Sequence, residues 1–553
     1  MQKLNGREWK NLIISAANNL ENHKNAINAL NVFPVPDGDT GSNMAATISA
    51  AKEAIKNQDV SHIGELSKII SQNMLLSARG NSGVILSQIF KGFTLSFASK
   101  QEITSFDLVQ AFEEAAKSAY KAVMKPIEGT ILTVIREVSE NLKDAVVVDN
   151  TFAEVLELAV NFARQSCDKT PQLLKVLREV GVTDSGGEGL FYILEGMRMY
   201  LEGSPAKLTE SESTISTFIS DSEVFTGEFG YCTEFILEIE KPKKFDKDSL
   251  VKKLEKMGSS MVVVHDGSLF KVHIHTTKPG DVLNAANGLG QFIRIKIDNM
   301  TVQANNSKEN NQKLHSKNGN GNGNGNGNGS PKLVNGSSLI SCNTGSGIIQ
   351  LMKDNNVDYV IEGGQTNNPS TQDIVQAIES VGTKTVFILP NNSNITLSAQ
   401  QAATLFKGKK EIVILPTKSQ AQALGVALMF NKENSVQENK TLMNDAIKNM
   451  RYGEIAPSIK DTKINGIKIK EGDFMVIADG KIVDTAKTNI QAAKLLIDEI
   501  MNDDTQIINI FYGQEVFKTE AEELQEYIQS TFDVEVEIYD SGQAIYPYLI
   551  SAE

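Results

Sequence analysis

Six consecutive Asn-Gly pairs, from Asn318 to Gly329, divide this chain into parts that cannot share one continuous core. The wider stretch 304–332 has almost no apolar side chains, so it cannot bury enough surface to offset its loss of conformational entropy on folding. We expect a flexible linker rather than a binding tail, with an r.m.s. reach of roughly 30 Å. The residues after the linker should then be able to move relative to those before it.

The hydrophobic pattern predicts a different fold class on each side of a second boundary near residue 203. Trp9, Leu12, Ile13, Ala16 and Leu20 follow helical spacing, whereas apolar runs such as YCTEFILEIE further along resemble strands. After the linker, short apolar runs alternate with helical stretches, which indicates a parallel α/β sheet. We therefore expect a multidomain protein, with an all-α domain over 1–203, a small α+β domain over 204–303, the linker over 304–332 and an α/β domain over 333–553.

Charge and cysteine content exclude several classes of protein. The 553 residues carry a net charge of −14, whereas a general nucleic-acid binder needs a basic face. No apolar run reaches the roughly 18 residues of a membrane span, and the first residues lack a signal-peptide pattern. Three cysteines, Cys167, Cys232 and Cys342, are too few for a disulfide framework. These features predict a soluble, cytoplasmic protein with no transmembrane segment and no nucleic-acid partner.

The segment PVPDGDTGSN carries the most chemical information in the chain. Asp37 and Asp39 are two residues apart across a glycine, so their carboxylates can converge on a hard cation such as Mg²⁺. The residues Thr40 to Asn43 then supply hydroxyls and backbone N–H groups before a helix expected over 43–56, and a helix N-terminus after such a loop attracts phosphate. An Asx turn with a helix cap would use the same residues without a ligand. The complete string favours the functional interpretation.

Three further loops place small or polar residues at a predicted helix start. They are Ser77–Gly83, Pro126–Thr130 and Thr183–Gly189. Each could be a simple helix cap. Four such loops in one helical domain are hard to explain by capping alone, so they predict a bundle with a site built on its loops.

With these residues in view, 1–200 resembles the nucleotide-binding domain of the dihydroxyacetone kinase family. The motifs that carry the resemblance are PDGDTGSNM, ARGNSGV, PIEGT and DSGGEGL. The resemblance implies an antiparallel helical barrel with ATP and two Mg²⁺ ions at one end. The longer form NVFPVPDGDTG, together with GGQTNNPST and LPNNSNI in the C-terminal part, resembles the family of fatty acid kinase catalytic subunits.

The resemblance implies a set of site residues. Asp37 and Asp39 would act in catalysis as Mg²⁺ ligands, and Asn31 is the nearest counterpart of a third, upstream carboxylate of the sugar kinases. The residues expected near ATP are Thr40, Gly41, Ser42, Asn43, Gly80, Asn81, Ser82, Gly83, Gly129, Thr130, Asp184, Ser185 and Gly186.

A second constellation lies in the expected α+β domain. His273 and His275 are two residues apart on a predicted strand, so both imidazoles share one face. They could be two histidines of a solvated face. The resemblance implies that Cys232 joins them as a zinc ligand, and a thiolate with two imidazoles suits Zn²⁺. It also implies a homodimer formed through this domain.

The resemblance implies a fatty acid kinase that transfers the γ-phosphate of ATP to a fatty acid carboxylate and yields an acyl phosphate and ADP. A carboxylate is already ionised at pH 7, so the attack needs no general base. A separate fatty-acid-binding protein would present the substrate. The C-terminal domain would dock this partner around Gln365–Ser370 and Asn391–Asn394, although ordinary loop chemistry would explain the same residues.

Two other functions remain open from the sequence. A dihydroxyacetone-type kinase holds its ketone on a histidine of the substrate domain, but no histidine follows His315, so a separate subunit would have to supply that group. A non-catalytic ATP-sensing scaffold would use the Asp pair only to bind Mg-ATP. The absence of a third carboxylate gives this alternative some support.

Overall fold

The computed structural model describes residues 3–31, 38–147, 149–209, 231–240, 245–254, 256–266, 268–299, 334–458, 461–464 and 466–553. They belong to two compact units, one of which joins residues 1–208 to residues 330–553, while the other spans 209–329. We call the described parts of the first unit the N-terminal lobe, up to residue 208, and the C-terminal lobe, from residue 334. The expected linker over 304–332 lies outside the described residues.

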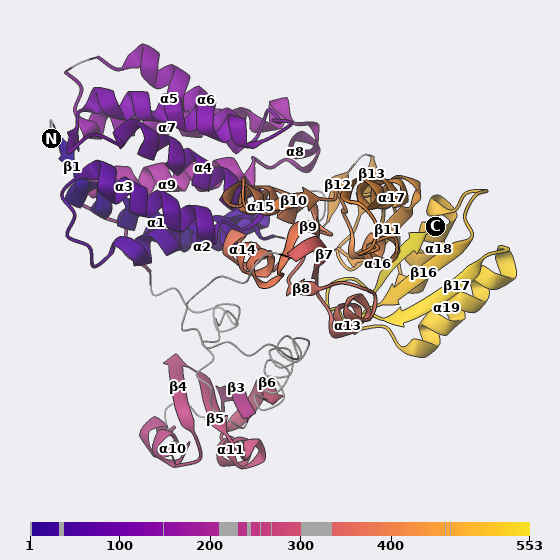
Figure 1. Cartoon of the computed structure of the whole chain (residues 1–553). Coiled ribbons are helices and arrows are strands. Elements are labelled where there is room, and N and C mark those ends of the chain that lie inside the picture. The colour runs from indigo at the N-terminus through magenta and orange to yellow at the C-terminus, as the bar shows by residue number, and fades with distance from the viewer. Residues whose placement is uncertain are drawn as a thin grey trace, which may run out of the picture. The chain divides into compact units, whose positions relative to one another are not determined.

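The N-terminal lobe is helical (Figure 1), which confirms the fold class expected for this region. Its elements are β1 (Leu4–Asn5), α1 (Gly6–Leu30), α2 (Thr40–Ile55), α3 (Ile63–Ser77), α4 (Gly80–Phe97), β2 (Glu102–Ile103), α5 (Ser105–Ala122), α6 (Ile131–Ala145), α7 (Phe152–Leu173), α8 (Lys175–Val180) and α9 (Ser185–Leu201). The two short strands pair with each other. The barrel closure that the resemblance implies stays a prediction.

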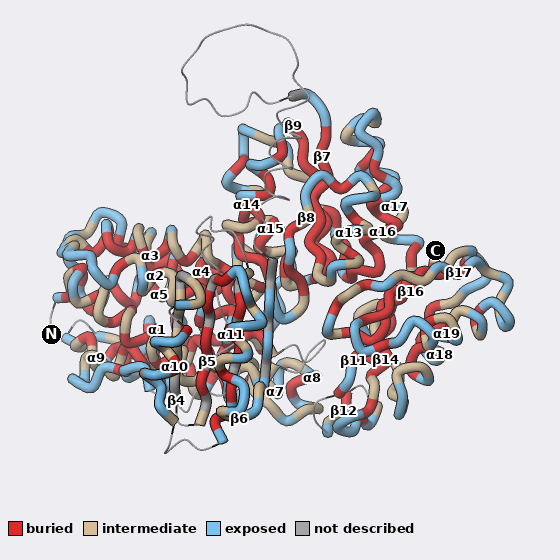
Figure 2. Tube along the Cα trace, turned by 90° about the horizontal axis from the view of Figure 1, so that it is seen from below, coloured by how far each residue is buried: buried red, intermediate tan, exposed pale blue. Residues whose placement is uncertain are grey.

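The apolar stripes predicted from the sequence build the core of this lobe. Trp9 and Leu20 of α1 are at most 2% exposed, and the helices bury one face each (Figure 2). Glycines bring the helices close: a methyl group on Gly92 of α4 would lie 2.4 Å from Cα of Ala115 on α5. Cys167 is fully buried in the same core, as expected of a packing residue. No helix among the described residues is long and apolar enough to cross a bilayer.

The middle unit contains a four-stranded antiparallel sheet in the order β4-β5-β3-β6 within its described part. Its elements are β3 (Tyr231–Ile239), α10 (Lys247–Leu254), β4 (Ser259–Asp266), β5 (Leu269–Thr276), α11 (Pro279–Ala286) and β6 (Gly290–Asn299). Phe235 and Ile274 alternate with residues of the other face and pack with Leu254 and Val282 of the two helices. This is the α+β arrangement that the sequence predicts.

The C-terminal lobe begins with a parallel sheet in the order β10-β9-β7-β8, as the alternating pattern predicts. The elements of this part are β7 (Val334–Asn343), α13 (Ser346–Asp354), β8 (Tyr359–Glu362), α14 (Thr371–Ser380), β9 (Thr383–Leu389), α15 (Ser393–Leu405), β10 (Glu411–Ile414), α16 (Gln420–Leu428) and α17 (Val436–Asn449). Loops at the carboxyl ends of these strands are the usual place for a site in such a sheet.

A second, mixed sheet completes this lobe, in the order β15-β14-β11-β18-β16-β17 among the described residues. Its part of the chain comprises β11 (Arg451–Pro457), β12 (Thr462–Ile464), β13 (Ile467–Ile469), β14 (Phe474–Ala478), β15 (Lys481–Ala486), α18 (Asn489–Ile500), β16 (Ile507–Tyr512), α19 (Lys518–Thr531), β17 (Glu535–Asp540) and β18 (Tyr548–Ala552). Strands β12 and β13 pair only with each other and form a separate two-stranded antiparallel sheet.

The two lobes of the first unit pack on each other. Helix α15 lies against α4, and α14 lies against α3 (Figure 1). A buried hydrogen bond of 2.8 Å joins Gln88 Nε2 to Gln401 Oε1 across this contact. The structure therefore differs from the sequence-based picture of a C-terminal domain that moves independently, because the described residues of both lobes share a buried polar interface.

Candidate active site

Asp39 occupies the N-cap position of α2, but its side chain makes no capping hydrogen bond. The carboxylate is only 6% exposed, and the amides of Asn43 and Asn368 hydrogen-bond to it instead. Asn368 Nδ2 lies 2.5 Å from Asp39 Oδ2. Burial raises the pKa of the Asp39 carboxyl, and the two amides partly oppose that shift. A buried carboxylate that does not cap its own helix is available for a cation.

The residues after Asp39 form the first turn of α2, which begins at Thr40 rather than at residue 43 as expected. Ser42 is exposed, and its hydroxyl accepts a hydrogen bond of 3.0 Å from the amide of Asn28 on α1. A methyl group on Gly41 would lie 2.3 Å from the Lys24 carbonyl oxygen, so α1 and α2 meet closely here. Ser42 is thus tied to α1, and no sequence motif marks Asn28 as its partner.

The second loop brings the start of α4 against α2. Gly80 has φ +57°, and a methyl group there would lie 2.5 Å from Asn43 Nδ2. At Gly83 a methyl group would lie 2.5 Å from Thr47 Oγ1 of α2. The partly buried Ser82 and Asn81 stand between these glycines. Glycine is therefore required at both positions because the two helices touch at their N-terminal ends.

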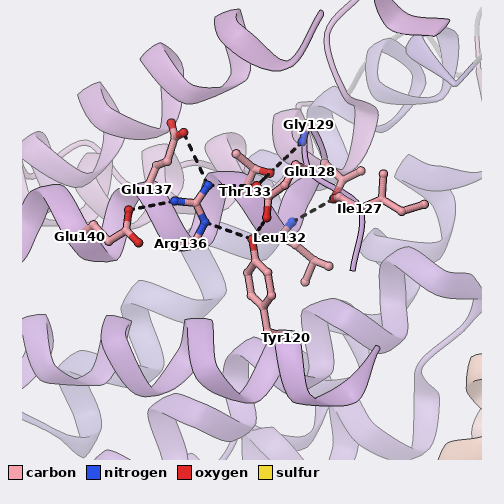
Figure 3. Close-up of polar contacts among 10 residues, drawn as sticks. Tyr120, Ile127, Glu128, Gly129, Leu132, Thr133, Arg136, Glu137 and Glu140 are labelled. Carbon is pink, nitrogen blue, oxygen red and sulfur yellow. Dashed lines mark hydrogen bonds and ion pairs between the residues drawn. The ribbon is translucent and has the colours of Figure 1, made fainter. Parts of the chain in front are cut away.

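The third loop, Pro126–Thr130, is largely satisfied by its own contacts. Thr130 caps α6, and the Gly129 N–H donates to Thr133 Oγ1 at 2.8 Å. Glu128 accepts from Tyr120, Thr133 and Arg136, as Figure 3 shows. These hydrogen bonds lower the pKa of the Glu128 carboxyl, with Thr133 the largest contributor. These hydrogen bonds hold the loop in place at the N-terminus of α6. The role of the loop near a nucleotide stays a prediction.

The fourth loop opens α9. Asp184 caps this helix by accepting from the Gly187 N–H at 2.7 Å, and the backbone N–H groups of Ile131 and Gly186 also reach it. Burial nevertheless raises the pKa of the Asp184 carboxyl to about 6. These three backbone hydrogen bonds give Asp184 a structural role at the start of α9. The roles of Asp184 and Gly186 near a nucleotide stay predictions.

Contacts between the loops bring all four helix starts together. Ser185 Oγ donates to Thr40 Oγ1 at 3.2 Å and so links α9 to α2. Asp184 links α9 to the first residue of α6, and Gly80 links α4 to α2. The N-termini of α2 and α4 thus lie beside Asp39, while those of α9 and α6 are joined to α2 through Ser185 and Asp184. Helix N-termini carry partial positive charge and free N–H groups, which favours phosphate binding.

The two other predicted magnesium ligands cannot be placed beside Asp39. Asp37 lies outside the described residues, and Asn31 follows the last turn of α1 as its C-cap. Among the described residues, no group of three His, Cys, Asp or Glu side chains could hold a metal ion. The magnesium site therefore stays a prediction, centred on Asp39.

The C-terminal lobe contributes residues for which the sequence predicts another role. Asn368 contacts Asp39, and Asn394 Oδ1 accepts from Asn81 Nδ2 at 3.0 Å. The expected docking surface is wrong for Asn368, Pro369 and Ser370, because they are buried within the chain. No local pattern in GGQTNNPST marks this contact, since it exists only through the packing of the two lobes.

The other expected docking segment, Asn391–Asn394, borders a cavity of about 270 Å³ in the C-terminal lobe. Asn391 and Asn392 are at most 7% exposed. Lys418, Glu454 and Tyr546 also line this cavity. Burial raises the pKa of the Glu454 carboxyl to about 7. Asn391 and Asn392 are therefore buried within the lobe, whereas Ser393 is exposed and Asn394 contacts Asn81 of the N-terminal lobe.

The predicted zinc ligands can be followed only through their backbones, because their side chains lie outside the described residues. Cys232 on β3 is directly opposite His275 on β5, and Glu234 is opposite His273. Opposite residues of an antiparallel pair share a face, so the register places the three predicted ligands on one face of the sheet. The zinc site stays a prediction.

The residues around Asp39 fit a hard cation with bound phosphates. The Oδ1 atoms of Asn81 and Asn368 are buried and have no hydrogen-bond partner among the described residues. Leaving a buried acceptor unpaired costs about 1–3 kcal/mol, and amide and carboxylate oxygens are ligands that Mg²⁺ accepts. A cation at Asp39 would satisfy the Asn368 oxygen, because the Asn368 amide already contacts Asp39, and the N-termini of α2 and α4 would hold its phosphates.

Comparison with known proteins covers most of the chain. Residues 34–199 match the DAK2 domain, 228–307 match the FakA-like middle domain of fatty acid kinases, and 338–553 match the FakA-like C-terminal domain. Among solved structures, a DegV family protein from Thermus thermophilus described as binding fatty acid aligns with a TM-score of 0.30 at 12% identity, over 39% of this chain and 99% of that chain. The dihydroxyacetone kinase from C. freundii with AMP-PNP and Mg²⁺ aligns with a TM-score of 0.28 at 18% identity, over 34% of this chain and 33% of that chain. Scores this low support no inference.

Curated relatives match over the full length. An uncharacterized protein of Staphylococcus epidermidis is 38% identical over 562 residues, which is 100% of both chains. The protein YloV of Bacillus subtilis is 37% identical over 567 residues, again 100% of both. An uncharacterized protein of Staphylococcus aureus is 36% identical over 563 residues, with the same coverage. The chain belongs to the FakA-like family of fatty acid kinases, whose N-terminal part is a DAK2 domain.

Proposed function

We propose that this chain is the catalytic subunit of a fatty acid kinase that works with a separate fatty-acid-binding protein. One observation carries the proposal: the N-termini of α2 and α4 lie beside the buried, non-capping carboxylate of Asp39. Such an arrangement holds phosphates and a divalent cation rather than an apolar ligand. Membership of the FakA-like fatty acid kinase family supports the choice of acceptor.

The residues would share the work of phosphoryl transfer. Asp39, with Asp37 from outside the described residues, would hold Mg²⁺, and the N-terminal N–H groups of α2 and α4 would bind the ATP phosphates. When bound, the cation neutralises charge on the phosphoryl group that moves to the acceptor. The fatty acid carboxylate is ionised at pH 7, so no side chain has to remove a proton. The site therefore needs positioning and charge rather than a general base.

The assay traps acyl phosphate with hydroxylamine. Full-length chain, Mg-ATP and a fatty-acid-binding protein loaded with palmitate are mixed, and the product is compared with that of Asp39→Asn. We expect acyl hydroxamate from the wild type only when the binding protein is present. Product without it would show that this chain binds fatty acid itself. Phosphorylation of dihydroxyacetone in place of palmitate, or nucleotide binding without any product, would contradict the proposal.

We also propose that the middle unit binds zinc through Cys232, His273 and His275. The antiparallel register of β3 and β5 supports this, because it places these three residues on one face of the sheet. Elemental analysis of the purified chain should give about one zinc per chain, and His275→Ala should lose it. Equal zinc content in both proteins would contradict the assignment.

A further inference from the structure

A loop of the C-terminal lobe, Gly363–Ser370, reaches the candidate active site of the N-terminal lobe. Reciprocal backbone hydrogen bonds between Gly364 and Asn367 fold it into a tight turn. Beyond the turn, Ser370 pairs with Arg79 as an antiparallel bridge, and the Thr371 N–H donates to the Ala78 carbonyl at 3.0 Å. The loop is therefore joined by backbone hydrogen bonds to the segment that precedes α4.

Asn368 is held at the centre of this contact. Arg79 Nη1 donates to its backbone carbonyl at 3.1 Å, and its side-chain Nδ2 donates to Asp39 Oδ2 at 2.5 Å. The residue is only 2% exposed. Backbone and side chain are thus both fixed by groups of the other lobe, which orients the amide relative to the Asp39 carboxylate.

The oxygen of the same amide has no partner. Asn368 Oδ1 is buried without a hydrogen bond among the described residues, and so is Asn81 Oδ1. A methyl group on Gly80 would lie 3.6 Å from Asn368 Nδ2, so the Asn368 amide lies at the start of α4. An unpaired buried acceptor is unfavourable, and the Asn368 amide oxygen together with the Asp39 carboxylate forms a donor set for a hard cation.

We propose that the kinase site is shared between the lobes: Asn368 orients Asp39 through Nδ2 and offers Oδ1 to the divalent cation that carries ATP. This inference rests on the proposed function and adds that the C-terminal lobe supplies part of the cation site. The N-terminal lobe then holds a complete site only while the Gly363–Ser370 loop is docked. The opposite arrangement, in which the loop obstructs the site, predicts the opposite sign for loss of Asn368.

The test measures Mn²⁺ binding to the full-length chain by electron paramagnetic resonance, in the presence of AMP-PNP. We expect Asn368→Ala to weaken Mn²⁺ binding about 10- to 100-fold, as is usual when a side chain that orients or supplements metal ligands is removed. Asn367→Ala is the matched control, because Asn367 is exposed in the same loop. Gln401→Ala controls for loosened lobe packing, because Gln401 joins the lobes through its hydrogen bond to Gln88 rather than through Asp39.

A second variant tests the role of the oxygen. Asn368→Asp places a second carboxylate next to Asp39, so the two like charges should lower the melting temperature in EDTA. Mn²⁺ should then raise the melting temperature of this variant by more than it raises that of the wild type. An equal shift in both proteins would show that the side chain at 368 does not face the cation.

The outcomes separate this inference from the function on which it rests. Wild-type-like Mn²⁺ affinity in Asn368→Ala would overturn the shared site and leave the kinase proposal intact. Tighter binding in Asn368→Ala would identify the loop as an obstruction. Equal losses of Mn²⁺ affinity in Asn368→Ala and Gln401→Ala would show that loosened packing of the lobes causes the loss, and would overturn the shared site. If the wild type itself binds no Mn²⁺ with AMP-PNP, both proposals fail.

Discussion

Asp39 and Asp184 occupy equivalent places in their helices and do different things. Each is the N-cap residue of a helix and precedes a hydroxyl residue and a glycine. Asp184 uses its carboxylate for the backbone N–H of Gly187 and its neighbours. Asp39 makes no such bond and instead meets the amides of Asn43 and Asn368.

The difference shows how one local pattern serves two purposes in one lobe. A carboxylate saturated by backbone N–H groups stabilises the start of its helix. A carboxylate held by side-chain amides, one of which has an unpaired oxygen, can exchange these contacts for a cation. Asp184 thus stabilises the N-termini of α9 and α6, and Asp39 is the carboxylate available to bind a cation.

The largest expected effect is on turnover. Asp39→Asn should lower acyl phosphate formation on the order of 10²–10³-fold, because it removes the buried charge that would hold the cation. Its thermal stability should not fall, since the variant no longer buries a desolvated charge. Hydroxylamine trapping and calorimetry check the two parts. If Asp39→Asn kept an activity within a few fold of the wild type, Asp39 would not be the cation-binding carboxylate, and its proposed difference from Asp184 would be wrong.

A pH titration sharpens the comparison next. The folded pKa of Asp184, about 6, lies above its ordinary value of 3.8, so its contribution to stability is complete below pH 4 and is lost as pH rises through 6. The stability of the wild type relative to Asp184→Asn should therefore fall between pH 4 and 7, by at most about 3 kcal/mol. Calorimetric unfolding of both proteins over this range measures it. A difference that stays constant with pH would contradict the assignment.

Removal of the cap should have a smaller effect. Asp184→Ala should lower the unfolding free energy of the N-terminal lobe by about 1–2 kcal/mol relative to Asp184→Asn, because backbone N–H groups at the start of α9 lose their acceptor. Urea unfolding monitored through Trp9, which is buried in this lobe, provides the measurement. Identical midpoints for the two variants would show that the capping bond contributes nothing.

The smallest effect concerns the link between the two helix starts. Ser185→Ala removes the hydrogen bond to Thr40 and should lower the unfolding free energy by about 0.5–1.5 kcal/mol. The same urea experiment measures the loss. An unfolding midpoint equal to that of the wild type would show that this hydrogen bond does not contribute to stability.

The sequence predicts the helical and α/β parts of the fold because these depend on local periodicity. Trp9, Leu12, Ile13, Ala16 and Leu20 are buried as their spacing requires. The predicted start of α2 is three residues late, because Thr40, Gly41 and Ser42 favour a loop by propensity but are held in a helical turn by α1.

The candidate site is predictable from the sequence only in its N-terminal half. The PDGDTGSN motif marks Asp39 because its chemistry is contiguous in sequence. Asn368 cannot be assigned in this way, since its partner lies more than 300 residues away and no helical or strand period connects them. The different roles of Asp39 and Asp184 are also hidden, because they depend on which donors the packing brings to each carboxylate.

A crystal structure of the full-length chain with Mn²⁺ and AMP-PNP would test the central claim most directly. The account predicts an anomalous peak within metal-ligand distance of Asp39, about 2.0–2.4 Å from its carboxylate, with Asn368 facing it and phosphates at the N-termini of α2 and α4. A nucleotide bound elsewhere, with Asp39 still hydrogen-bonded to Asn368 and no metal beside it, would contradict the account.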